Sequence, residues 1–214
     1  MAVPSASSTL NPTATPFLPA ITSLPRLSEP ALTATLDLLF EPSADLHALA
    51  LPTLRALSFA SYDDLVATLR AQLLELADAV EGDPEGRRRL FSVLGSHPRL
   101  GEKKKKTSSK EGAKGEEGLS EMSAAEQGHL AAEDEELARL NREYEAHFPG
   151  LRYVVWVNGR PRGEILADMR ARIGRGDMRT EVRAVIEAMC DIAADRASKL
   201  LQNSAKEAVE NQKS

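Results

Sequence analysis

Apolar residues recur every three or four positions along most of the chain, which is the spacing that one face of an α-helix requires. This pattern predicts helices, one of them broken near Pro52, in the ranges 32–40, 46–57, 62–80, 84–94, 122–148, 162–173 and 177–201. Residues 153–157 alone have the character of a β-strand, and a single strand has no partner with which to form a sheet. The sequence therefore predicts an all-α fold, with many helices around one core in a single compact domain.

Two segments differ from the helical pattern. Residues 1–28 contain five prolines, five serines, four threonines and no acidic residue, a composition that cannot bury enough apolar surface to offset the entropy of ordering. Residues 102–118 contain six lysines and four glutamates beside one apolar residue, Ala113, which predicts a solvated internal loop. We therefore expect a disordered tail at 1–28, a helical domain at 29–203 that carries the charged insert, and a second tail at 204–214.

Charge and composition argue against several classes of function. The chain has 214 residues and a formal net charge of −5, so it has no overall positive charge with which to hold nucleic acid. The single cysteine, Cys190, excludes an internal disulfide and a cysteine-based zinc cluster, and it is interpreted as a small core residue. The four histidines lack the spacing of a helical zinc motif, and the apolar stretches are too short to cross a membrane. We expect no metal, no nucleic-acid partner and no membrane partner.

The predicted 122–148 helix places polar residues on the face that should enter the core. Its apolar stripe, followed backwards in steps of three and four, meets Gln127 or Glu126 and then Ser123. One interpretation is a capping box, in which Ser123 and Glu126 bind backbone N–H groups at the start of the helix. The other interpretation is a polar site that faces the interior of the domain.

The last predicted helix carries an arginine, Arg196, on its apolar stripe. A buried guanidinium needs an anionic partner, because an unpaired buried charge costs several kcal/mol. One interpretation is an internal ion pair with an acidic side chain, or a side chain that reaches out to solvent. The other is an anion-binding site, since arginine matches a carboxylate through two parallel hydrogen bonds.

A histidine stands in a glycine-bounded turn, within the run Gly95-Ser96-His97-Pro98-Arg99-Leu100-Gly101. Pro98 disfavours the helical conformation for His97, so this side chain is expected on a rigid turn after a helix. It is interpreted either as an acid or base for proton transfer or as a cap for the preceding helix. The sequence has no phosphate-binding loop, dinucleotide motif or nucleophile elbow. A histidine, a carboxylate and an arginine without those motifs favour cofactor-free chemistry on a small acidic molecule.

Five motifs stand in order along the chain: His97-Pro98-Arg99-Leu100-Gly101; Ser123-x-x-Glu126-Gln127; Leu140-Asn141-x-x-Tyr144-Glu145-x-x-Phe148; Gly159-Arg160 with Glu164-Ile165-Leu166; and Ile192-Ala193-x-x-Arg196. Together they resemble the OHCU decarboxylase family, whose full name is 2-oxo-4-hydroxy-4-carboxy-5-ureidoimidazoline decarboxylase. The resemblance extends from about residue 30 to residue 203. Each motif alone is weakly specific, whereas the ordered set of five is specific.

The resemblance implies an all-α, homodimeric enzyme of urate breakdown that uses no cofactor. It implies that His97 is the catalytic histidine and that Glu126 is the acid paired with it. The substrate, a small ureidoimidazoline, would be bound by four further residues: Pro98, Ser123, Gln127 and Arg196. The family also binds substrate through its backbone near residues 148–154, where this chain has one residue more, so those contacts are not carried over.

The expected activity is decarboxylation of this substrate to (S)-allantoin in urate catabolism. An alternative is a family member that has lost catalysis and acts as a helical protein-interaction module, although none of the expected site residues is missing. The cytoplasm is the expected compartment, because residues 211–214 are not a peroxisomal C-terminal address. A peroxisomal location is the alternative, because Arg26-Leu27 resembles the start of an N-terminal targeting signal whose end does not match at Thr33.

Overall fold

The computed structural model describes residues 17–80, 82–101 and 135–211. Their regular structure consists of a short 3₁₀ helix and seven α-helices: η1 (Ile21–Arg26), α1 (Glu29–Leu39), α2 (Ala44–Ala56), α3 (Tyr62–Ala79), α4 (Pro84–Leu94), α6 (Glu135–His147), α7 (Arg162–Arg175) and α8 (Met178–Asn211). None of the described residues forms a strand, and residues 153–157 belong to an irregular connection between α6 and α7. The all-α prediction is confirmed.

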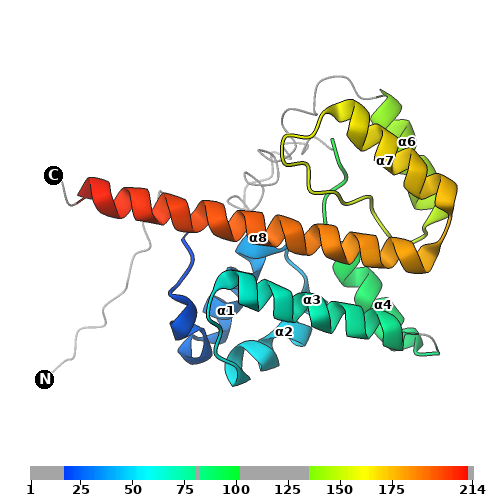
Figure 1. The fold of residues 1–214 in the computed structure, drawn as a ribbon. Coiled ribbons are helices and arrows are strands. Elements are labelled where there is room, and N and C mark those ends of the chain that lie inside the picture. The colour runs from blue at the N-terminus through cyan, green and yellow to red at the C-terminus, as the bar shows by residue number, and fades with distance from the viewer. Residues whose placement is uncertain (1–16, 81, 102–134, 212–214) are drawn as a thin grey trace, which may run out of the picture.

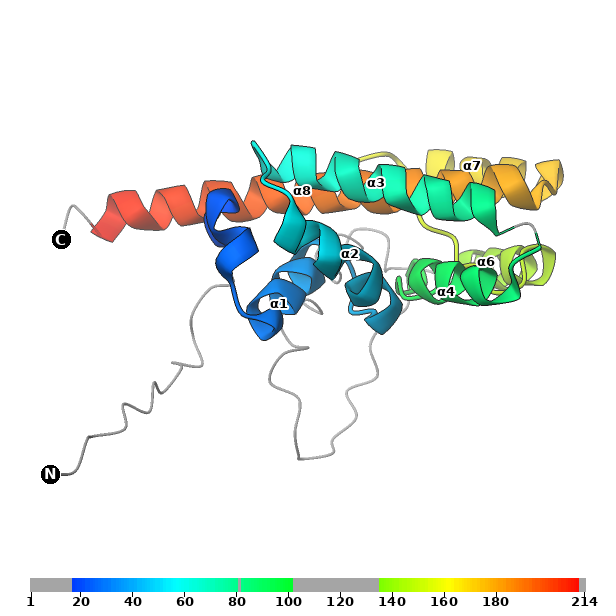
Figure 2. The ribbon, with the colours of Figure 1, turned by 90° about the horizontal axis from the view of Figure 1, so that it is seen from below.

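Three helices, α1, α3 and α4, pack against the long helix α8 (Figure 1). Helix α3 lies alongside α8 in both views, and α1 contacts both α2 and α8 (Figure 2). In Figure 1 the helices α6 and α7, which pack on each other, lie on the opposite side of α8 from α1–α4. The buried apolar side chains of these helices form one core, so the prediction of a single compact domain is confirmed.

Local sequence signals account for several helix ends. Ser61 and Asp83 precede α3 and α4, and their side chains accept hydrogen bonds from the backbone N–H groups of the first turn. Pro84 occupies the first turn of α4, where a missing N–H group costs nothing, and the helix ends before Gly95 as predicted. Gly176 ends α7 in the left-handed conformation, with φ of 64°.

The predicted break at Pro52 is wrong, because α2 continues through this residue to Ala56. Proline in a helix interior removes one backbone hydrogen bond and costs about 3 kcal/mol. Leu46, Ala50 and Leu54 lie one turn apart and are all buried on the same face of α2. Burial of this face across the proline offsets the lost hydrogen bond, since a fully buried leucine contributes about 1.5–3 kcal/mol.

Both predicted tails need correction. Within 17–28, Leu18 and Leu24 are buried, and the hydroxyl of Tyr62 donates to the backbone carbonyl of Pro19 at 2.7 Å. The domain therefore begins before residue 29, because η1 packs against α2 and the two leucines belong to the core. At the other end α8 continues to Asn211, through most of the predicted 204–214 tail, because the sequence after 201 is rich in good helix formers.

Two further predictions concern residues that the structure does not describe. The 102–118 insert lies entirely outside the described ranges, as do residues 1–16 of the tail. Of the predicted 122–148 helix, the described part is α6. Cys190, in contrast, lies fully buried in the core as predicted, and burial raises the pKa of its thiol to about 11. The protonated thiol is a poor nucleophile, which fits a packing role.

Candidate active site

The turn after α4 carries the first predicted site residue. Its start is closed by backbone contacts: the N–H of Gly95 donates to Phe91, and the hydroxyl of Ser96 donates to the carbonyl of Val93 at 2.7 Å. Gly95 and Ser96 thus satisfy carbonyl groups at the end of α4. His97 follows with its side chain buried, at 6% exposure.

Three contacts from other parts of the chain hold this turn in place. Arg152 donates to the backbone carbonyl of His97 at 2.8 Å. Asn141 of α6 donates to the carbonyl of Leu100 at 3.0 Å. Arg99 forms a two-pronged ion pair with Glu145 of α6, at 2.5 and 2.7 Å. The motif residues Asn141 and Glu145 therefore anchor the histidine turn to α6.

His97 and Pro98 line a cavity of about 200 Å³. The connection 153–159 forms a second part of the cavity wall, and α8 contributes Ile192, Asp195 and Lys199. The volume lies below the ~300–1,000 Å³ of pockets for drug-sized ligands, so the cavity suits a small metabolite better than a large cofactor. An imidazole beside such a cavity is suited to hold or transfer a proton.

Arg196 lies in the core of the domain and not in the described lining of this cavity. Its side chain is fully buried and pairs with Glu41 at 2.9 Å, and it approaches the carbonyl of Leu39 at 3.4 Å. The internal ion pair, one of the two interpretations, is confirmed. Arg196 is not among the described residues that line the cavity, so its role in substrate binding stays a prediction.

Three of the six predicted site residues, Ser123, Glu126 and Gln127, lie outside the described residues. The structure thus brings His97 and Pro98 together at one cavity and leaves the pairing of His97 with Glu126 as a prediction.

Several cavity residues were not predicted from the sequence. Asp195 and Lys199 lie one helical turn apart on α8, and Trp156 contributes an aromatic ring from the connection 153–159. Asn158 and Gly159 both have positive φ, 38° and 72°, and the N–H of residue 160 closes the turn on Val157 at 2.8 Å. The sequence could have indicated this turn, because Asn-Gly is the dipeptide that most favours a tight turn with positive φ.

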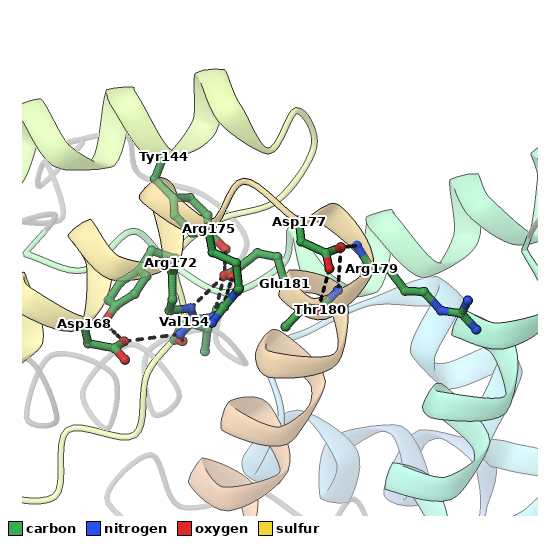
Figure 3. Close-up of polar contacts among 10 residues, drawn as sticks. Tyr144, Val154, Asp168, Arg172, Arg175, Asp177, Arg179, Thr180 and Glu181 are labelled. Atoms are coloured by element: carbon green, nitrogen blue, oxygen red, sulfur yellow. Dashed lines mark hydrogen bonds and ion pairs between the residues drawn. The ribbon is translucent and has the colours of Figure 1, made fainter.

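A buried ionic network lies behind the cavity wall, and Figure 3 shows its side chains converging on one carboxylate. Glu181 of α8 is fully buried, and it accepts hydrogen bonds from the hydroxyl of Tyr144 at 2.5 Å and from Nε of Arg172 at 2.8 Å. Arg175 lies 3.3 Å from the second oxygen of the same carboxylate. Burial, followed by the hydrogen bond to Glu181, raises the pKa of Tyr144, so its hydroxyl stays protonated and donates.

This network also holds the connection that forms the cavity wall. Arg172 donates to the backbone carbonyl of Val154 at 3.1 Å, and its guanidinium lies 4.8 Å from the centre of the Tyr153 ring. Tyr153 in turn donates to Asp168 at 2.6 Å. The network therefore joins α6, α7 and α8 to the wall, and Arg172 and Glu181 are positioning residues for it. The available sequence signal was Arg172 itself, a charged residue on the apolar stripe of its helix.

The described ranges contain no group of three or more His, Cys, Asp or Glu side chains arranged to hold a metal ion. None of the helices in those ranges is both long enough and apolar enough to span a membrane.

A comparison with protein families gives one finding. Residues 25–198 match the family model described as OHCU decarboxylase. A search of curated proteins gave no match. The matched range contains all the described residues that line the cavity except Lys199.

Proposed function

The chain belongs to the OHCU decarboxylase family, and we propose that it converts 2-oxo-4-hydroxy-4-carboxy-5-ureidoimidazoline to (S)-allantoin without a cofactor. The observation that carries this proposal is the cavity beside His97 and Pro98, on a turn that three separate contacts hold in place. A small ring fits its volume. The family supports the coarser assignment, a decarboxylase of urate breakdown.

The substrate itself makes a cofactor unnecessary in this proposal. One ring carbon carries both a carboxylate and a hydroxyl, and the neighbouring carbon belongs to a C=N bond. When the bond to the carboxylate breaks, CO₂ leaves and its electron pair moves into that C=N system. The ring nitrogen of that bond takes up one proton, and a second proton is added to the neighbouring carbon. The hydroxyl loses its proton, and the hydroxyl-bearing carbon becomes a carbonyl. The overall change is replacement of CO₂ by one proton.

The protein then has to orient the ring and deliver a proton to one face. In the proposed mechanism Pro98 packs against the ring, and His97 contacts the hydroxyl or the departing carboxylate. Glu126 orients the imidazole and shares its proton. The remaining substrate contacts come from Ser123, Gln127 and Arg196, the last with its guanidinium oriented by Glu41.

The test is a rate measurement on substrate formed in situ from urate. His97→Ala is expected to lower the rate by about 10²–10⁴-fold, as removal of a general acid or base does. His147→Ala is the matched control, because His147 is an exposed histidine at the end of α6 that does not line the cavity. A loss below tenfold in both His97→Ala and Glu126→Ala would contradict the mechanism.

A further inference from the structure

A charge pair on α8 lies at the solvent side of the same cavity. The ammonium of Lys199 lies 2.6 Å from a carboxylate oxygen of Asp195, one helical turn away, and both residues line the cavity. The side chain of Lys199 is 57% exposed and that of Asp195 is 21% exposed. The lysine therefore lies where this cavity meets solvent.

Among the described residues that line this cavity, Lys199 is the one lysine, and no arginine is present. It therefore supplies the permanent positive charge of the described lining. The guanidinium of Arg196 is engaged by Glu41 and does not line the described part of the wall. The substrate proposed above carries a carboxylate, which enters beside the negative charge of Asp195. A carboxylate approaching Asp195 is repelled unless a cation lies between the two groups.

The Lys199–Asp195 pair is easily rearranged. It is an exposed pair of the i, i+4 type, and such pairs contribute little to stability. An ammonium group has three donors on a flexible stem, so it can keep Asp195 as one partner and bind a second carboxylate with another N–H. Trp156 and Ile192, which also line the cavity, offer apolar surface to the ring of the same ligand.

From this arrangement we infer that Lys199 is a specificity-determining residue, which selects ring compounds that carry a carboxylate over neutral rings of the same size. The inference rests on the proposed function, because it names how that substrate is recognised. Asp195 positions the ammonium group of Lys199. Because Asp195 and the ligand's carboxylate compete for the same ammonium group, Asp195 also lowers the affinity of the cavity for the ligand.

The binding test uses Trp156, the single tryptophan of the chain, as a fluorescence reporter within the cavity. The probes are 5-hydantoinacetate and hydantoin, two small rings that differ by the carboxylate arm. The wild-type protein is expected to bind 5-hydantoinacetate more tightly. Lys199→Met, which keeps the apolar stem, is expected to raise the Kd for 5-hydantoinacetate about tenfold, as loss of one charge-assisted hydrogen bond does. The Kd for hydantoin should not change.

Two further variants serve as controls in the same titration. Lys206→Met removes an exposed lysine from the same helix, outside the cavity lining, and should leave both Kd values unchanged. Asp195→Asn removes the competing carboxylate and should lower the Kd for 5-hydantoinacetate. The corresponding kinetic result for Lys199→Met is a KM raised about tenfold with kcat nearly unchanged, because the carboxylate contact forms on binding.

The outcomes separate this inference from the proposed function. Loss of the preference for 5-hydantoinacetate in Lys199→Met supports the inference even if the wild-type protein has no decarboxylase activity, in which case the proposed function alone fails. Equal Kd values for Lys199→Met and Lys206→Met, or a wild-type protein that does not distinguish the two probes, would overturn the inference, even if decarboxylation is observed.

Discussion

Replacing Glu181 by glutamine removes the negative charge at the centre of the network behind the cavity wall. In the native protein this carboxylate is fully buried and faces Tyr144, Arg172 and Arg175. Arg172 has only 8% of its side chain exposed, so its charge cannot be solvated in the variant. Its remaining acidic neighbour, Asp168, lies farther away, at 3.6 Å.

The magnitude follows from this burial. Removing one partner of a buried ion pair costs about 3–5 kcal/mol, because the other charge stays buried without compensation. For a domain of this size each kcal/mol lowers Tm by about 2–4 °C, so Glu181→Gln should lower Tm by about 6–20 °C. Thermal and urea unfolding, followed by circular dichroism, measure both quantities.

The matched control is Glu187→Gln on the same helix. Glu187 pairs with Arg70 at 2.8 Å, but its side chain is 45% exposed and Arg70 retains Asp191 at 2.8 Å. An exposed pair of this kind contributes about 0–1 kcal/mol. If the two variants lose the same stability to within about 1 kcal/mol, the buried network contributes no more to stability than an exposed ion pair does, which would refute this reasoning.

Three further predictions concern other parts of the domain. Gly150→Ala should destabilise the protein more than Gly159→Ala does, as measured by urea unfolding. Both positions have positive φ, but a Cβ atom at Gly150 would lie 2.7 Å from the Phe91 ring, whereas a Cβ atom at Gly159 would have no atom within 4 Å. The hydrogen bond from Arg99 holds the pKa of Glu145 below its usual value, although burial opposes it, so the pair stabilises the fold above the unfolded-state pKa and loses this effect as the pH falls through the lowered value. The stability difference between wild type and Glu145→Gln, under about 1 kcal/mol near pH 7, should therefore shrink as the pH falls below the unfolded-state pKa and vanish once the pH is below the lowered pKa. The protein is also expected to be a homodimer, and sedimentation equilibrium at micromolar concentration would contradict this by showing a monomer.

Much of the helical framework was predictable, because its signals are local. The range of α3 follows from leucines at helical spacing, and the start of α4 follows from Asp83 and Pro84. Pro52 was misleading, since the propensity of one residue was outweighed by burial on either side of it. Leu18 and Leu24 were missed because the proline-rich and serine-rich composition around them obscured their apolar character.

The candidate site was predictable only where a single residue type carries its own signal. His97 and Pro98 were identified from their turn, and Arg196 from its place on an apolar stripe. The partner of Arg196 could not be identified, because Glu41 lies 155 positions away in the chain and meets it only through packing of the folded helices. Glu181 and Lys199 were missed for the same reason, since an acidic or basic residue on a helix is ordinary until its neighbours are known.

The proposed reaction is decarboxylation of the ureidoimidazoline intermediate, with the new proton added on one face of its ring. The most direct measurement is circular dichroism during turnover, with the unstable substrate generated in situ from urate. We expect rapid formation of optically active (S)-allantoin by the wild-type protein, with formation reduced to the spontaneous rate in His97→Ala. Racemic allantoin formed at the spontaneous rate by the folded wild-type protein would contradict the proposed reaction.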